Sequence, residues 1–183
     1  MTPVVVLLVV LVIVAVVLVA MYNGLVRLRN QVDSAWAHVD VQLRRRYDLI
    51  PNLVETVKGY AAHERETLEA VIQARNRAMA AGSPKEQAEA ENIFAGAIRG
   101  LLALSESYPE LKANENFENL QKELSDTESK VAYARQYYND IVAKYNTRIQ
   151  TFPTVMVAGM FGFRPREYFE AEGDSRGPVV VDF

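Results

Sequence analysis

The sequence predicts an all-α protein in which one transmembrane helix precedes an antiparallel bundle of three long helices and one short helix. Two observations support this fold class. Val4–Met21 is an apolar run without a charged side chain, and beyond it the apolar residues recur about every 3.5 positions. We therefore expect a transmembrane anchor at residues 1–22, a helical bundle domain at 23–172 and a C-terminal tail at 173–183.

The apolar run is long enough to cross a bilayer. At ~1.5 Å per residue, Val4–Met21 spans ~27 Å, close to the thickness of the hydrocarbon core. A cleaved secretory signal is the alternative, but it needs a positively charged start and a small-residue cleavage site. Only Met1, Thr2 and Pro3 precede the run, so the sequence favours an uncleaved single-pass anchor.

Flanking charge predicts the orientation of this anchor. Arg27 and Arg29 follow the apolar run, whereas its N-terminal side carries only the α-amino group. Under the positive-inside rule, the bulk of the chain faces the cytoplasm. The lipid bilayer is the first predicted partner.

The first helix of the bundle is expected to run from Leu25 to about Ala80 and to bend. A straight helix of this length would measure ~85 Å, far more than a compact domain allows. Pro51 supplies the bend, because its ring opposes the carbonyl of Tyr47 and it donates no hydrogen bond. The buried face is predicted to hold Leu25, Leu28, Val32, Trp36, Val39, Leu43, Tyr47, Ile50, Val54, Val57, Ala61, Leu68, Val71 and Ile72.

Two further long helices and one short helix complete the predicted bundle. Ser83–Glu86 is a capping box that opens a helix ending near Ser107. Asn114 is the expected N-cap of the next helix, which Pro153 closes, and Val155–Phe161 forms the short helix. The buried seam starting after Asn114 is predicted to contain Phe117, Leu120, Leu124, Thr127, Val131, Ala134, Tyr138, Ile141, Tyr145, Ile149 and Phe152.

Composition excludes several classes of function. The chain has 183 residues, no cysteine and a net charge of −3. Without cysteine there is no thiol catalysis, disulfide scaffold or Cys-ligated zinc, and the net charge gives no case for nucleic acid as a partner. No nucleophile elbow or phosphate-binding glycine loop occurs, so we expect no cofactor and no enzymatic activity.

The two histidines leave one enzymatic alternative open. Neither His38 nor His63 has the Glu-x-x-His spacing of a di-iron bundle. His63-Glu64 is not followed by the second histidine of a zinc protease, because Thr67 stands at that position. The alternative is a metal-dependent or His/Glu-based hydrolase that uses His63 with Glu64 or Glu66.

Two polar clusters are candidate interaction sites. The first is predicted to form a network around Pro51 that contacts a partner, and it consists of Arg44, Arg45, Arg46, Asp48 and Asn52. The three arginines cannot share one helix face, because successive helical residues span about 200°. The second is a Tyr-Asn pair repeated seven residues apart, so that both tyrosines face the same way: Tyr138, Asn139, Tyr145 and Asn146.

Motifs along nearly the whole chain resemble those of a known family. They are Tyr22-Asn23, Val41–Val54, Val57–Tyr60, His63-Glu64, Ala113–Phe117, Leu120-Gln121, Leu124, Thr127-Glu128, Ala134-Arg135, Tyr138-Asn139, Tyr145-Asn146 and Phe152-Pro153. In this order they resemble the LemA family of bacterial membrane proteins. The number and length of the matching motifs make this resemblance specific.

The resemblance implies a membrane-anchored helical bundle and carries no catalytic residue set. Relatives are associated with cell-envelope functions, with membrane zinc proteases of the heat-shock type and with magnetosome membrane formation. We therefore expect a scaffold or adaptor in the bacterial inner membrane. It is expected to self-associate as a homo-oligomer and to bind a membrane protease or other envelope proteins.

Overall fold

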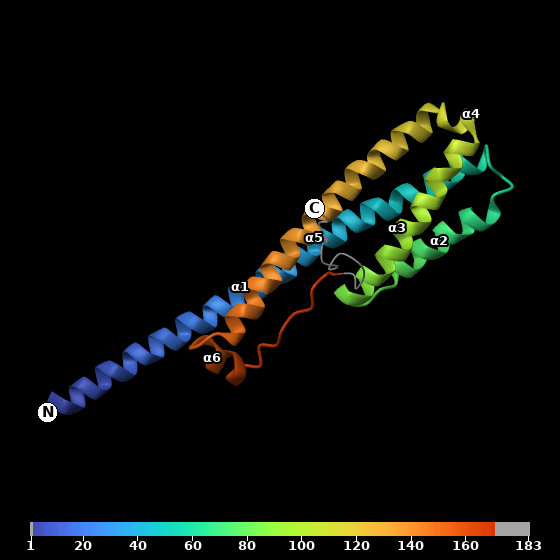
Figure 1. Cartoon of the computed structure of the whole chain (residues 1–183). Coiled ribbons are helices and arrows are strands. Elements are labelled where there is room, and N and C mark those ends of the chain that lie inside the picture. Colours follow the sequence, from blue (N-terminus) through green and yellow to red (C-terminus); the bar gives the residue numbers. More distant parts are fainter. Residues whose placement is uncertain (1, 171–183) are drawn as a thin grey trace, which may run out of the picture. The chain divides into compact units, whose positions relative to one another are not determined.

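The computed structural model describes residues 2–170, and these contain six helices and no strand. The helices are α1 (Thr2–Lys58), α2 (Arg65–Met79), α3 (Pro84–Ser107), α4 (Pro109–Lys112), α5 (Glu115–Gln150) and α6 (Thr154–Met160) (Figure 1). The all-α fold class with an apolar N-terminal helix and a helical bundle is confirmed. The predicted tail at 173–183 lies outside the described residues.

The helix expected to continue from Leu25 to Ala80 is in fact two helices, so that prediction was wrong. α1 ends at Lys58, and residues 59–64 form the turn that leads into α2. Glycine is the weakest helix former after proline, which favours a break at this point. The turn brings the apolar face of α2 into the core, where Leu68, Val71, Ala74 and Ala78 are buried.

Pro51 lies inside α1 and does not end it. A proline in a helix interior leaves the carbonyl four residues earlier without its helical donor. Here that carbonyl belongs to Tyr47, and the Nε–H of Arg75 donates to its oxygen at 2.8 Å. A side chain from α2 thus replaces the missing backbone bond, which allows the helix to continue to Lys58.

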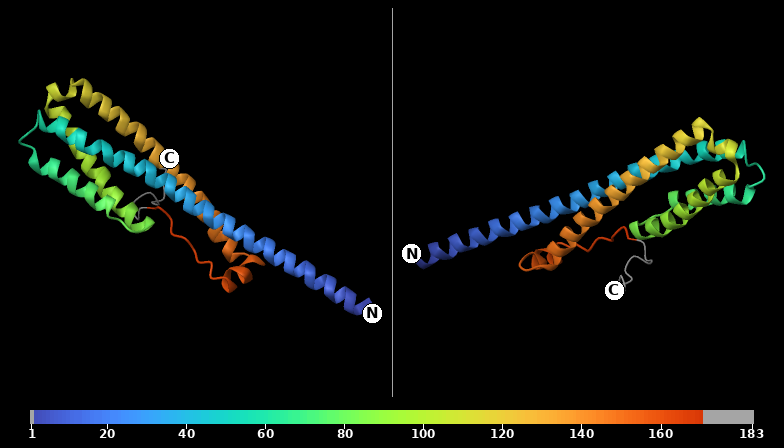
Figure 2. Two further views of the ribbon diagram at one scale, coloured as in Figure 1. Left: turned by 180° about the vertical axis from the view of Figure 1, so that it is seen from behind. Right: turned by 45° about the horizontal axis from the view of Figure 1, so that its top comes forward.

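The described helices form two compact units. The first unit contains α1 up to Val41, α5 from Ala132 onward, α6 and the chain to Glu167. Its α1 and α5 lie side by side, as all views in Figures 1 and 2 show, and the rings of Trp36 and Tyr138 meet at 5.1 Å between centroids.

The second unit contains the end of α1, helices α2, α3 and α4, and the start of α5. α2 and α3 pack directly against each other (Figure 1). The described residues from Tyr168 onward also belong to this unit. Its core is formed by fully buried aromatic and aliphatic side chains, the largest being Phe94, Phe117, Phe169, Leu43, Ile50, Leu53, Leu101, Leu111 and Val57.

The predicted helix starts are confirmed by hydrogen bonds. Ser83 Oγ accepts from the amide of Glu86 at 3.3 Å, while the Glu86 carboxylate accepts from the amide of Gly82 at 3.0 Å. Asn114 Oδ1 accepts from the amide of Phe117 at 3.0 Å. The bonds from the Glu86 and Phe117 amides satisfy donors that the first turn of a helix leaves without partners, while the bond from Gly82 fixes the residue before the N-cap.

The seam of α5 is buried as its spacing predicts, except that Leu120 is half-buried and the last member, Phe152, is exposed. Thr127 is fully buried, and its hydroxyl donates to the Glu123 carbonyl at 2.8 Å, so its polar group is satisfied one turn back. Phe152 was predicted to be a buried member and is 80% exposed. The physical reason is that α5 ends at Gln150, so Phe152 lies in the turn before α6 and no longer follows the helical spacing.

Candidate functional site

The Tyr-Asn repeat of α5 holds a later segment of the first unit. We call residues 161–167, which follow α6, the C-terminal strap. The hydroxyl of Tyr138 donates to the Glu167 carbonyl at 2.8 Å, and the hydroxyl of Tyr145 donates to the Arg164 carbonyl at 3.0 Å. Both tyrosines face the same way, as the spacing of seven predicts, and both recognise backbone rather than side chains.

Asn146 binds the strap through both ends of its amide. Its Nδ2 donates to the Arg166 carbonyl at 2.9 Å, and its Oδ1 accepts from the Arg166 amide at 2.8 Å. The Arg166 guanidinium then pairs with Asp33 of α1 at 2.9 Å. The strap therefore joins α1 and α5 within the first unit. Asn139 also forms an interaction, and its side chain is half-buried.

The path of the strap is set by a glycine and two phenylalanines. Gly162 has a φ of 69°, the left-handed conformation that commonly ends helices, and the Phe163 amide donates back to the Ala158 carbonyl at 3.0 Å. Tyr22 of α1 contacts the rings of Phe161 and Phe163 at 4.8 and 5.8 Å between centroids. The strap thus reaches the part of α1 directly after the apolar run.

Burial changes the acidity of both strap-binding tyrosines. Desolvation raises the pKa of Tyr138 to about 12, while the nearby Arg166 opposes the shift. Desolvation likewise raises the pKa of Tyr145, against the opposing charges of Arg166 and Arg29. Both hydroxyls therefore stay protonated at neutral pH and act as hydrogen-bond donors to the strap.

The arginine triplet is divided between the core and the surface of the second unit. Arg46 is buried, whereas Arg44 and Arg45 are exposed. Asp48 and Asn52 are also exposed. The five residues predicted to form one network around Pro51 therefore lie in two environments, and Arg46 alone enters the core.

Arg46 takes part in a buried polar cluster that joins α1 to α3. Its guanidinium forms an ion pair with Glu91 and lies 5.2 Å from the centre of the Phe94 ring. The Tyr47 hydroxyl donates to Glu91 and accepts from Gln87 Nε2 at 2.8 Å. Burial lowers the pKa of Arg46, an effect that the Glu128 carboxylate, 3.9 Å from Arg46, opposes. An arginine remains charged even so, which explains why a carboxylate is buried beside it.

Glu91 and Gln87 are the core-forming polar residues that the sequence analysis missed. A signal for them exists in the spacing of α3. If the apolar stripe is extended backwards in steps of three and four, the buried set becomes Gln87, Glu91, Phe94, Ile98, Leu101 and Ser105. A polar residue in such a series usually indicates that the buried stripe has ended. Gln87 and Glu91 can be assigned to the buried face only once Arg46 is known to be their neighbour in the core.

The residues of the enzymatic alternative do not form a convergent site. His63 and Glu66 are exposed, and Glu64 accepts a hydrogen bond from the Tyr108 hydroxyl at 3.0 Å. This bond is the main reason that the pKa of Tyr108 is raised. Among residues 2–170, no group of three or more His, Cys, Asp or Glu side chains is placed to hold a metal ion.

The apolar start of α1 differs from every other helical segment in its surroundings. All large apolar side chains from Val4 to Val19 are exposed, and this stretch is long and apolar enough to cross a membrane by length and composition. An N-terminal signal sequence can meet the same criterion of length and composition. The structure and the apolar segment together define a class: membrane-associated helical proteins without strands in the described part.

Comparison with known proteins identifies the family. Residues 35–183 match the LemA family, and the chain belongs to it. Magnetosome protein MamQ of Magnetospirillum gryphiswaldense is 24% identical over 190 residues, which cover 90% of this chain and 70% of that protein. Protein LemA of Metamycoplasma hominis is 29% identical over 143 residues, covering 78% of this chain and 65% of that protein. The predicted resemblance is confirmed.

Proposed function

We propose that this protein is a single-pass scaffold of the bacterial inner membrane, which self-associates and presents its helical bundle to other envelope proteins on the cytoplasmic side. One observation carries the proposal. The apolar half of α1 is exposed throughout, yet it continues without a break into a folded helix whose later part is buried in the bundle. Such a helix ties a folded domain to a bilayer.

Two further features support a binding role rather than catalysis. The buried side chains of Arg46, Glu91 and Asn146 are occupied in packing the helices and in binding the backbone of the strap at Arg166. Arg44 and Arg45 are exposed in the stretch of α1 before Pro51, and their positive charge suits an acidic partner surface, although Arg44 also interacts within the chain. The similarity to a magnetosome protein supports a place in a membrane system.

Orientation is tested with single cysteines in a chain that has none of its own. Thr2→Cys and Glu106→Cys are expressed in intact cells and exposed to a membrane-impermeant maleimide. We expect labelling at position 2 only, with position 106 labelled after lysis. Labelling at 106 in intact cells contradicts the cytoplasmic orientation, and release of the protein from membranes by carbonate contradicts the anchor.

Partner binding is tested by cross-linking in intact membranes followed by mass spectrometry. The Arg44→Ala/Arg45→Ala variant is compared with Arg77→Ala/Arg99→Ala, which removes the same charge from exposed positions of the same unit. In the wild type we expect cross-links between copies of this protein and cross-links to a recurring membrane protein. The cross-links to the membrane protein should decrease in Arg44→Ala/Arg45→Ala and not in Arg77→Ala/Arg99→Ala. Equal profiles in all three proteins would contradict a role for these arginines, and an isolated monomer would contradict the scaffold.

A further inference from the structure

The turn between α5 and α6, together with α6, carries a cluster of exposed apolar side chains, which we call the α6 tip. It consists of Phe152, Val155, Met156, Met160 and Phe161. Met160 is 77% exposed and Met156 62%, values comparable to the residues of the apolar run of α1. A patch of large apolar side chains at one end of a unit marks a surface that is covered by something else.

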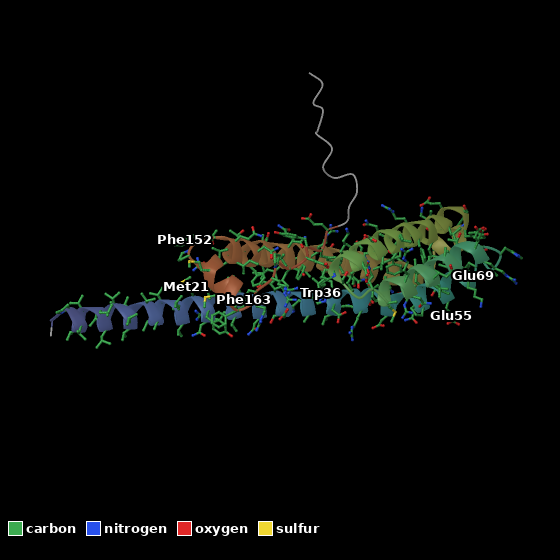
Figure 3. The ribbon with its side chains drawn as sticks, turned by 90° about the horizontal axis from the view of Figure 1, so that it is seen from below. Met21, Trp36, Glu55, Glu69, Phe152 and Phe163 are labelled. Carbon is green, nitrogen blue, oxygen red and sulfur yellow. The ribbon has the colours of Figure 1, made fainter. Side chains whose placement is uncertain are left out.

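Ring contacts place this tip beside the end of the apolar run. Phe161 lies 4.8 Å from the ring of Tyr22, the residue directly after Met21. The register of the two long helices agrees. Trp36 meets Tyr138. At ~1.5 Å per residue, α1 runs ~21 Å from Trp36 back to Tyr22, and α5 runs ~18 Å from Tyr138 to its end at Gln150, two residues before Phe152. Figure 3 shows Phe152 and Phe163 at the level of Met21.

The charges at this level have one sign. No acidic residue occurs in positions 1–32 or 141–166, whereas five exposed arginines lie there: Arg27, Arg29, Arg148, Arg164 and Arg166. Arg166 is paired with Asp33, and the other four lie outside that ion pair. The Arg29 guanidinium lies 5.5 Å from the centre of the Phe163 ring. Tyrosines such as Tyr22 are enriched at the headgroup level of a bilayer, and arginines close to the surface are attracted to anionic headgroups.

From this juxtaposition we propose that the α6 tip inserts into the headgroup and acyl boundary of the same leaflet that the apolar run enters, and that it prefers anionic lipids. The first unit is then held on the membrane at two points, α1 and the tip. The inference rests on the proposed anchoring of α1, since Tyr22 marks the bilayer surface only if the run before it spans the hydrocarbon. An insertion depth of ~5–10 Å is typical of such apolar faces.

The test uses the full-length protein in vesicles of phosphatidylcholine with phosphatidylglycerol. A nitroxide label is attached to one of three single-cysteine variants, and its collisions with oxygen and with a water-soluble nickel chelate are measured by power saturation. Met156→Cys reports on the tip and Val12→Cys on the apolar run. Tyr133→Cys is the matched control, because it is 74% exposed in the same unit but lies on α5, ~26 Å of helix before the end of α5 at Gln150.

We expect the oxygen-to-nickel ratio at position 156 to exceed that at position 133 several-fold and to lie between the values at 133 and 12. Replacing phosphatidylglycerol with phosphatidylcholine should lower the ratio at 156 and leave that at 12 unchanged. Equal ratios at 156 and 133 overturn the inference. If neither oxygen nor the nickel chelate reaches the label at position 156, and the spectrum shows dipolar broadening between labels, the membrane inference is overturned. The α6 tip would then be covered by a second copy of the chain. A low ratio at position 12 instead overturns the membrane anchoring itself.

Discussion

The Nε–H of Arg75 donates to the carbonyl oxygen of Tyr47, the one backbone acceptor that Pro51 leaves without a helical donor. The bond joins α2 to α1 at the place where the sequence predicts a bend. It supplies a donor to the carbonyl that lacks one where α1 passes through Pro51. A proline that weakens one helix is thereby used to attach another.

This bond predicts that substitutions at Arg75 and Pro51 have coupled effects on the free energy of unfolding. Arg75→Ala should lower the free energy of unfolding by about 1–2 kcal/mol, because the Tyr47 carbonyl loses its donor. In a Pro51→Ala background the same change should cost less, since the alanine amide at position 51 can donate to that carbonyl. A double-mutant cycle in urea measures the difference. Equal costs in both backgrounds would show that Arg75 acts through other contacts.

The amide of Asn146 predicts local protection of the strap. Asn146→Ala removes both bonds to Arg166, so the Arg166 amide should exchange its hydrogen much faster while the amides of α3 keep their rates. Hydrogen exchange followed by mass spectrometry measures both regions. Lys144→Ala, at an exposed position of the same helix, is the control and should leave the strap protected.

The buried ion pair predicts a strong asymmetry within the arginine triplet. Arg46→Met leaves the Glu91 carboxylate buried without its cation and should cost about 3–5 kcal/mol, whereas Arg45→Met should change stability by less than about 0.5 kcal/mol. Adding Glu91→Leu to Arg46→Met should restore part of the loss. Thermal unfolding of the four proteins tests this, and similar effects at positions 45 and 46 would contradict the burial of Arg46.

The raised pKa of Tyr138 predicts loss of stability in alkali. Because the folded-state pKa of about 12 exceeds the unfolded value of about 10, the unfolded chain loses this proton first as pH rises. The contribution of Tyr138 is therefore fully present below pH ~10 and is lost as pH rises towards ~12. Tyrosine ionisation is followed by ultraviolet absorbance at alkaline pH in the wild type and in Tyr138→Phe. The wild type should show one additional tyrosine that ionises late, near pH 12. In urea that difference should move to about 10, and a difference already at 10 in the folded protein would refute the assignment.

The two glycines around the end of α6 predict opposite responses to the same substitution. A Cβ meets no atom within 4 Å at either Gly159 or Gly162, but Gly162 alone has a positive φ, of 69°. Gly162→Ala should therefore cost roughly 1 kcal/mol, and Gly162→Asn less, since asparagine tolerates this conformation. Gly159→Ala, within the helix, should be neutral or stabilising. Chemical denaturation of the three variants measures the differences.

The sequence predicts most helices because their buried faces follow a local rule. The starts at Ser83 and Asn114 and the seam of α5 depend only on residues a few positions apart. The reversal of the chain after Lys58 does not follow from such local spacing. Leu68 and Val71 continue the apolar spacing of the preceding residues whether the chain forms one long helix or two. The choice between them depends on packing, which includes the bond from Arg75 to Tyr47.

The candidate sites were harder to predict for a related reason. The spacing of Tyr138 and Tyr145 correctly indicates a shared face, but nothing local to α5 shows that its partner is the backbone at 164–167. Likewise, three adjacent arginines look equivalent in the sequence, and only the position of Glu91 on α3 distinguishes Arg46 from its neighbours. Whether the exposed members bind another protein stays a prediction.

The bond between Asp33 and Arg166 joins residues 133 positions apart. At a synthesis rate of about 5–20 residues per second, Asp33 leaves the ribosome about 7–27 s before its partner. Residues Gln42–Val131 are synthesised during that interval. They include every described residue of the second unit except residues 168–170. The order of translation therefore favours folding of the second unit first, while the first unit closes only when the last helices have been made.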